Sequence, residues 1–287
     1  EIGVRLVGSE MCIRDSLYPA GGMDCDFQNL FTNKLIKMNY AIFCYREDYK
    51  CLELCVGQIR RVDPDCTIYL FDDGKAPLAR KDIPRGRDII YKKTYFERNR
   101  NLNGLECIRG MLSCMRDIPG REPIIKIDAD TLLMSLEEIR KSLFERRKLA
   151  GGYQCAVPFA WSGVCYWVTR KFISDALDVL VTREFPTRNQ DYPEDVTVSR
   201  LALYLYGRKG VDVIEFQGGK YLIGIRTCDS GQLSKLAKLA RRVSAVHCGQ
   251  QDFYEPIIQQ SGCTIREACA RIMWEILHPG EPEGFRL

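Results

Sequence analysis

The chain has 287 residues, 46% of them hydrophobic and 28% charged, and its formal net charge is +4. This is ordinary globular composition with enough chain to bury a core, and so mild a charge gives no indication of a nucleic-acid partner. No run of about 18 apolar residues and no signal-peptide pattern occurs, so we expect no transmembrane segment. The 14 cysteines are scattered through apolar segments, which favours buried thiols in a reducing compartment. We therefore expect a cytoplasmic protein.

Residues 1–38 are interpreted as an N-terminal extension. Leu6–Asp15 resembles the translation of a sequencing adapter, so we expect the extension to be partly artefactual and leave it out of the fold reasoning. A genuine N-terminal extension is the alternative.

Strands and helices alternate along residues 39–147. Short apolar runs predict strands at 40–45, 66–71, 88–92 and 124–127, and amphipathic spacing predicts helices at 47–61, 104–115 and 135–147. Ser135 and Glu138 have the spacing of a capping box at the start of the last helix. Such alternation predicts a mostly parallel, doubly wound sheet.

The second half of the chain is more mixed. Strands are expected at 156–160, 164–169, 211–216 and 221–225, with Trp161–Gly163 connecting the first two, and helices at 171–181, 194–206 and 264–277. No repeat or low-complexity tract breaks the chain. We expect one domain over residues 39–249, with halves 39–147 and 148–249, followed by a C-terminal helical tail over 250–287.

Two carboxylates follow the apolar run Ile124–Ile127. Asp128 and Asp130 stand on the same side of an extended chain, where their repulsion is unfavourable unless a cation or a shared proton relieves it. A hard divalent metal is the simplest relief. In an open α/β sheet, ligands bind at this carboxyl end of the strands. An acidic turn that only caps the next helix is the alternative.

Three acidic clusters occur in a recognisable order, namely Asp72–Gly74, Asp128–Asp130 and Pro193–Val196. Over residues 39–249 this arrangement resembles the GT-A fold glycosyltransferases. The resemblance implies an α/β fold of the GT-A (Rossmann-like) type, a single domain with a mostly parallel central sheet flanked by helices. It also implies a nucleotide-sugar donor, with a UDP-sugar expected, and an Mn²⁺ or Mg²⁺ ion held by the Asp-x-Asp carboxylates.

The resemblance assigns the metal ligands residue by residue. Asp130 is expected to contact the metal directly, and Asp128 to serve the ribose and the metal shell. Many GT-A enzymes use a late histidine as a third ligand, and His247, which follows an apolar pair, is the candidate because a neutral imidazole suits Mn²⁺. A structural histidine is the alternative.

Further polar residues are candidates for donor binding. They are Tyr45 and Arg46 after the first strand, Asp72 and Asp73 after the second, Arg98, Arg100 and Asn103 before a helix, and Trp161 and Gly163 near the donor sugar or the acceptor. Each has a structural alternative: a surface turn, an Asp-Gly turn, a solvated loop, or, for Trp161, the core.

The segment Pro193–Val196 supplies the candidate catalytic base. Its Glu-Asp-Val sequence resembles the fringe and β-1,3-galactosyltransferase type of inverting enzyme, which implies that Asp195, or Glu194, deprotonates an acceptor hydroxyl. Inverting transfer passes through an oxocarbenium-like transition state. Acidic residues that only favour the first turn of a helix are the alternative.

The resulting hypothesis is metal-dependent transfer of a sugar from a nucleotide-sugar to a hydroxyl of a glycan, a lipid-linked or a small-molecule acceptor. A haloacid-dehalogenase-type phosphatase also has an Asp-x-Asp after an apolar strand, but its threonine is expected one position later than Thr131. A nucleotidyltransferase lacks support because no glycine-rich loop follows the first strand. A noncatalytic carbohydrate-binding relative is the third alternative.

Overall fold

A seven-stranded sheet organises the chain. The computed structural model describes residues 37–96, 104–154, 160–182, 185, 193–214, 222–224, 230–249 and 262–279. In spatial order the strands are β3 (Ile89–Lys93), β2 (Thr67–Asp72), β1 (Asn39–Cys44), β4 (Ile124–Ile127), β7 (Trp161–Val168), β6 (Ala150–Gln154) and β8 (Val211–Ile214). Neighbours pair in parallel except β7, which is antiparallel to β4 and to β6. The predicted α/β class and mostly parallel sheet are confirmed.

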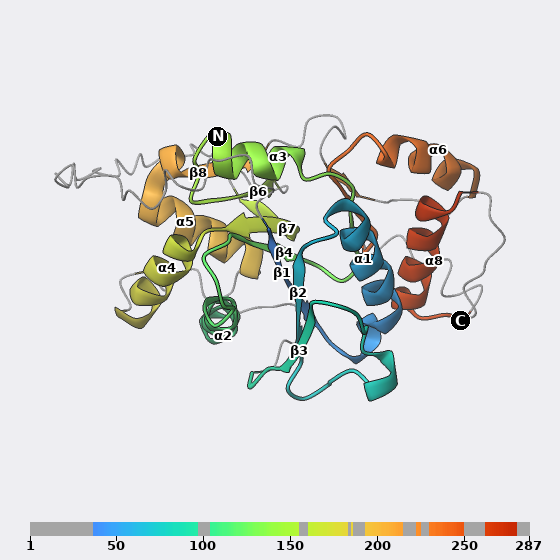
Figure 1. Ribbon diagram of the computed structural model, residues 1–287, viewed down its shortest axis with the longest axis horizontal. Coiled ribbons are helices and arrows are strands. Elements are labelled where there is room, and N and C mark those ends of the chain that lie inside the picture. Colours follow the sequence, from blue (N-terminus) through green and yellow to red (C-terminus); the bar gives the residue numbers. More distant parts are fainter. Residues whose placement is uncertain are drawn as a thin grey trace, which may run out of the picture. The chain divides into compact units, whose positions relative to one another are not determined.

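Helices cover both faces of this sheet (Figure 1). One side carries α1 (Tyr49–Val62), α6 (Ser230–Ala240) and α8 (Ile265–Leu277), and the other carries α2 (Leu105–Arg116), α4 (Arg170–Thr182) and α5 (Glu194–Gly210). The two buried clusters divide in the same way, since α1 and α8 contribute to one and α2, α4 and α5 to the other. No helix of these described segments is long and apolar enough to cross a membrane.

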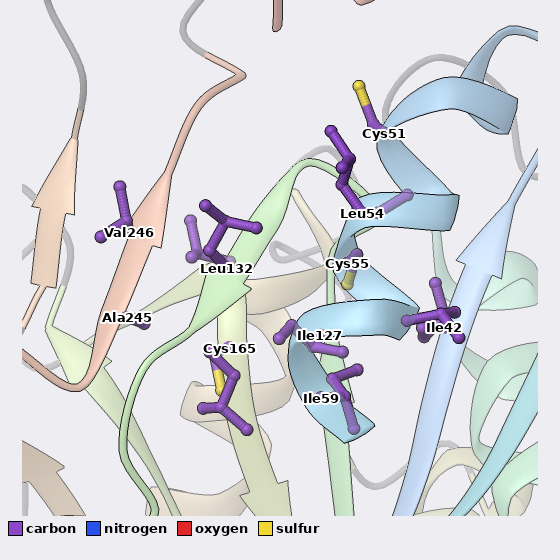
Figure 2. Packing of buried hydrophobic residues seen from close by; sticks show 14 of the residues in the cluster. Ile42, Cys51, Leu54, Cys55, Ile59, Ile127, Leu132, Cys165, Ala245 and Val246 are labelled. Carbon is purple, nitrogen blue, oxygen red and sulfur yellow. The ribbon is translucent and has the colours of Figure 1, made fainter. Parts of the chain in front are cut away.

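The core on the α1 side explains why this helix forms where the sequence predicts it. Its apolar positions fall on one face, and Cys55 and Ile59 are fully buried there. Figure 2 shows these side chains beside Ile42 of β1 and Ile127 of β4. The amphipathic spacing that predicts this helix therefore corresponds to its buried face.

A second, three-stranded sheet adjoins the first and was not predicted. It contains β5 (Thr131–Leu133), β10 (Ala245–His247) and β9 (Leu222–Gly224), with β10 antiparallel to β5 and parallel to β9. The chain leaves β4, turns over residues 128–130, and enters β5. The Asp-x-Asp segment is therefore the link between two sheets, and β10 brings His247 opposite Thr131.

The predicted helix over 135–147 and its capping box are wrong in detail. The helix α3 covers only Glu137–Arg140 and continues as a π-helical turn, Lys141–Glu145. Leu136 is the N-cap, and the Ser135 hydroxyl accepts from the Glu137 N–H at 3.2 Å. The Ser135 backbone N–H, which a capping box would offer to Glu138, donates to the Ser244 carbonyl beside β10, like that of Met134. Glu138 instead pairs with Lys141 and Arg146.

Two further differences lie around β7. Trp161–Gly163, predicted as a connection, is the first part of β7. The preceding strand β6 was not predicted because its Gly151 and Gly152 weaken the strand pattern. Both glycines face aromatic rings, and a Cβ on Gly151 would lie 2.7 Å from the Trp167 indole. Residues 155–159, most of the expected strand 156–160, lie outside the described residues.

Candidate functional site

The turn after β4 presents the Asp-x-Asp carboxylates at the carboxyl edge of the main sheet. The turn is closed by the Thr131 N–H, which donates to the Asp128 carbonyl at 3.1 Å. Asp128 N–H donates to the Val164 carbonyl of β7, and Cys248 N–H donates to the Asp130 carbonyl. These backbone bonds tie the turn to both neighbouring strands, so the positions of the two carboxylates are set by the sheets.

Asp130 is buried between a histidine and an arginine. Its Oδ1 lies 3.5 Å from His247 Nε2, and its Oδ2 accepts a hydrogen bond from the Arg266 guanidinium. Burial alone raises the pKa of a carboxyl, but Arg266 and His247 hold the pKa of Asp130 well below its usual range. Burial lowers the pKa of His247, whereas the Asp130 carboxylate raises it, and the net direction is upward.

Arg266 was not identified from the sequence. It lies in the first turn of α8 and also pairs with the buried Asp48, with Nε 3.4 Å from Oδ1. A basic side chain is unfavourable at this end of a helix because the N-terminal end of the macrodipole is positive. That conflict is the one signal in the sequence that could have pointed to Arg266.

Asp128 has a different partner, the fully buried Lys126 of β4. The Lys126 ammonium lies 2.6 Å from Asp128 Oδ1 and 2.8 Å from Glu194 Oε1, and it donates to the Gly163 carbonyl at 2.6 Å. Burial alone lowers the pKa of a lysine, but here Asp128 and Glu194 raise it, so Lys126 is charged. The signal in the sequence that points to Lys126 is a lysine within an otherwise apolar strand.

Glu194 and Asp195 begin α5 beside this lysine. Burial raises the pKa of Glu194 to about 7, a rise that Lys126 opposes and the Asp195 carboxylate supports. Asp195 is less buried, and its two oxygens accept from the Gly163 N–H at 2.7 Å and the Val196 N–H at 2.8 Å. Burial also raises the pKa of Asp195. The structure thus brings Asp128, Gly163 and the acidic pair together.

Gly163 and Gly249 leave the room that this arrangement needs. A Cβ on Gly163 would lie 3.2 Å from Glu194 Oε2. A Cβ on Gly249 would lie 2.0 Å from Asp130 Oδ2 and 2.8 Å from His247 Nε2. The distance of 2.0 Å to Asp130 Oδ2 is far below any real contact, so only glycine fits at Gly249 without moving Asp130.

The carboxylate and imidazole of Asp130 and His247 have the chemistry and spacing of two ligands of one divalent ion. Mg²⁺ is commonly bound by one or two protein groups together with substrate phosphates, and imidazole suits Mn²⁺. Within the described segments no group of three His, Cys, Asp or Glu side chains is close enough to hold a metal, and Asp128 pairs with Lys126. The residues therefore fit a metal that also takes ligands from a substrate.

The predicted donor contacts near β1 and β2 have local structural roles. Asp72 Oδ2 accepts from the Leu78 N–H and the Tyr91 hydroxyl. Asp73 Oδ1 accepts from the N–H groups of Lys75 and Ala76 in the turn that follows it. Tyr45 N–H donates to Asp48 Oδ2. These bonds shape the loop after β2 and the turn before α1, as the structural alternatives expect, and they leave the donor-binding role untested.

The remaining predicted contacts have three outcomes. Trp161 is fully buried, its Nε1–H donates to the Asp212 carbonyl, and its ring stacks on Tyr166, which supports the core alternative. Arg46 is exposed and lines a cavity of about 420 Å³ together with Lys50 and Arg266. Arg98, Arg100 and Asn103 lie outside the described residues.

The chain is similar in fold to solved structures of glycosyltransferases. The chain matches no protein-family model and no curated protein. An active-site mutant of the galactosyltransferase LgtC is similar over 87% of this chain and 99% of its own, with a TM-score of 0.50 and 12% identity. LgtC in complex with donor and acceptor sugar analogs has a TM-score of 0.49 and 11% identity, again over 87% of this chain and 99% of its own. The glycosyltransferase GlyE of Streptococcus pneumoniae TIGR4 has a TM-score of 0.49 and 14% identity, over 83% of this chain and 60% of its own. The likeness to the LgtC mutant, whose TM-score is 0.50, shows a fold of the GT-A type.

Proposed function

We propose that this protein is a glycosyltransferase that moves a sugar from a nucleotide-sugar, with a UDP-sugar expected, to an acceptor hydroxyl of a glycan, a lipid-linked molecule or a small molecule. The observation that carries the proposal is the pairing of Asp130 with His247, 3.5 Å apart, at the carboxyl edge of a GT-A type sheet. The base candidates Glu194 and Asp195 lie in the same network through Lys126 and Gly163.

Asp130 and His247 would hold the Mn²⁺ or Mg²⁺ ion, with Asp128 beside them. When bound, such an ion acts as a Lewis acid and stabilises the negative charge that develops on the leaving diphosphate. The role of the chain is to fix the two ligands: Gly249 leaves their space open and the Cys248 N–H holds the Asp130 backbone.

Asp195 is better suited than Glu194 to deprotonate the acceptor. Glu194 is 6% exposed and pairs with Lys126, whereas Asp195 is half-buried and bound only through neutral N–H donors in the contacts described above. Burial raises the pKa of Asp195, which strengthens it as a general base at neutral pH. A base acting on the face opposite the leaving group gives inversion of anomeric configuration.

Donor turnover tests the metal assignment. A panel of nucleotide-sugars is incubated with the protein with and without Mn²⁺, and hydrolysis or transfer is compared between the wild type and Asp130→Asn. We expect turnover that requires the metal and falls in the variant. Equal turnover with and without Mn²⁺ in both proteins would contradict the metal role. Hydrolysis of sugar phosphates dependent on Asp128 would favour a phosphatase instead.

A second variant tests the base. Asp195→Asn should lower turnover by about 100-fold or more while sparing donor binding, because general bases contribute about 10²–10⁴ in rate. NMR of the first product formed gives its anomeric configuration. Retention would overturn the assignment of Asp195 as the base of an inverting reaction, and binding of sugars without any turnover would favour the noncatalytic alternative.

A further inference from the structure

Arg266 occupies a position that helix stability does not explain. It is the second residue of α8, where a positive side chain opposes the helix macrodipole. The start of this helix is fixed independently: Thr264 and Glu267 form a reciprocal capping box, and Glu267 pairs with Lys50 of α1 at 3.0 Å. Arg266 is therefore held over the site by an anchored element, and its charge serves something other than the helix.

The charge of Arg266 is directed at two carboxylates. Its Nη1 contacts Asp130 Oδ2 and its Nε lies 3.4 Å from Asp48 Oδ1, while only 21% of its side chain is exposed. Asp130 is also the carboxylate that faces His247. A divalent cation at that pair would carry the same sign of charge as Arg266, and like charges that share a buried carboxylate repel each other.

Arg266 also lines a cavity. The cavity of about 420 Å³ is lined by Arg266 together with Arg46 and Lys50, and by Glu47, Asp82 and Glu267. It lies at the first turn of α8, where the macrodipole favours an anion. An anionic group that enters beside Arg266 would compensate its charge and so remove the repulsion toward a metal.

We propose that Arg266 is an internal counter-ion of Asp130 that keeps divalent-metal affinity low until an anionic donor binds beside it. The inference rests on the proposed function, and it makes metal and donor binding cooperative. A purely orienting role has the opposite sign: if Arg266 only held Asp130 in place, its removal would weaken metal binding, typically by about 10–100-fold.

Metal titrations without any acceptor or turnover test the proposal. Mn²⁺ alone is titrated by electron paramagnetic resonance into the wild type, Arg266→Gln, Arg266→Lys and Arg271→Gln. We expect about tenfold or tighter Mn²⁺ binding in Arg266→Gln, within the usual range of couplings between sites. Arg266→Lys, which keeps a cation, should stay near the wild type. Arg271→Gln, which removes a partly exposed charge from the same helix, should leave the affinity unchanged.

The same titrations with UDP present test the cooperativity. UDP should tighten Mn²⁺ binding more in the wild type than in Arg266→Gln. Equal or weaker Mn²⁺ binding by Arg266→Gln, or no binding by either protein, would overturn the proposal. Circular dichroism checks folding, and Arg266→Met, which retains the aliphatic part of the side chain, replaces a Gln variant that does not fold. Tighter binding by the variant, with a wild type that turns over no nucleotide-sugar, would overturn the proposed function and leave the counter-ion role standing.

Discussion

Lys126 and Arg266 supply the positive charges that pair with the two Asp-x-Asp carboxylates. Lys126 neutralises Asp128 from within the sheet, and Arg266 neutralises Asp130 from the C-terminal helix. Carboxylates at i and i+2 repel each other, and Asp130 is also buried, so both carboxylates need such cations. The sequence shows the need for positive charge at this site, but it does not show that the chain itself supplies two of the cations.

Replacing Lys126 by methionine should strongly destabilise the protein. Glu194 would keep a buried negative charge without this cation, the partly exposed Asp128 would lose its cation too, and breaking a buried ion pair costs about 3–5 kcal/mol. The free energy of unfolding at pH 8 is measured by urea denaturation. Combining Lys126→Met with Glu194→Gln should recover part of the loss, because one uncompensated carboxylate is removed. A single variant as stable as the wild type would show that this network is not needed for the fold.

Gly249→Ala should impair the site more than the fold. The added Cβ would lie 2.0 Å from Asp130 Oδ2 and 2.8 Å from His247 Nε2, so the geometry of this pair must change, and we expect a loss of about tenfold or more in metal-dependent turnover. Overpacking of this kind costs about 1–3 kcal/mol.

Gly57→Ala in α1 is the matched control for this substitution. Nothing lies within 4 Å of its added Cβ, so turnover should be unchanged and stability equal or higher by about 0.5–1 kcal/mol. Turnover and urea denaturation are measured for both variants. Equal turnover of Gly249→Ala and the wild type would contradict the role of Asp130 and His247.

At the scale of elements, α8 has a larger role than that of a tail. The sequence predicts the helix and its start near Thr264, and the capping box there is present. Its apolar face packs on α1 and α6, burying Ala268, Cys269 and Met273. The helix thereby carries Arg266 to the Asp-x-Asp turn, 136 residues away in sequence. Helix periodicity predicts which face is buried, but not against which element.

Glu267→Gln should weaken the start of α8 in a pH-dependent way. The N–H of Thr264 and the ammonium of Lys50 lower the pKa of Glu267 below its usual value. Its ionised form therefore adds stability above the unfolded pKa of about 4.3, and this is lost as the pH falls through the folded pKa. We expect the variant to be less stable by about 0.3–1 kcal/mol at pH 7. Urea denaturation at pH 7 and pH 3 should show a difference only at pH 7; the same difference at both would contradict an electrostatic role.

At the scale of the whole molecule, the two sides of the sheet have separate cores joined through the strands. The α1 side includes β5, β10 and α8, so the elements that carry Asp130, His247 and Arg266 share one hydrophobic cluster. The other side contains α2, α4 and α5. The candidate site lies where the strands end and both groups of elements meet, which is why its residues come from distant parts of the chain.

Met273→Ala should destabilise the protein through this shared core. Met273 is fully buried in α8, and truncating such a side chain costs about 2–5 kcal/mol through lost burial and the cavity left behind. Val181→Ala in α4 is the control, because Val181 is 67% exposed and such changes stay within about 0.5 kcal/mol. Thermal and urea unfolding followed by circular dichroism compare the two. A loss no larger than that of Val181→Ala would mean that α8 is not part of the core.

The sequence by itself determined the first half of the sheet, from β1 to β4, since the strands are mostly apolar runs and the helices α1 and α2 have a clear amphipathic face. It also determined that Asp128 and Asp130 end a buried strand. Only the tertiary structure decided that β5 joins a second sheet, that Ser135 bonds to the segment before β10, and that Lys126 and Arg266 hold the two carboxylates. The reason is physical: apolar periodicity is a local property that one segment carries, whereas the partner of a buried charge depends on which distant segment folds against it.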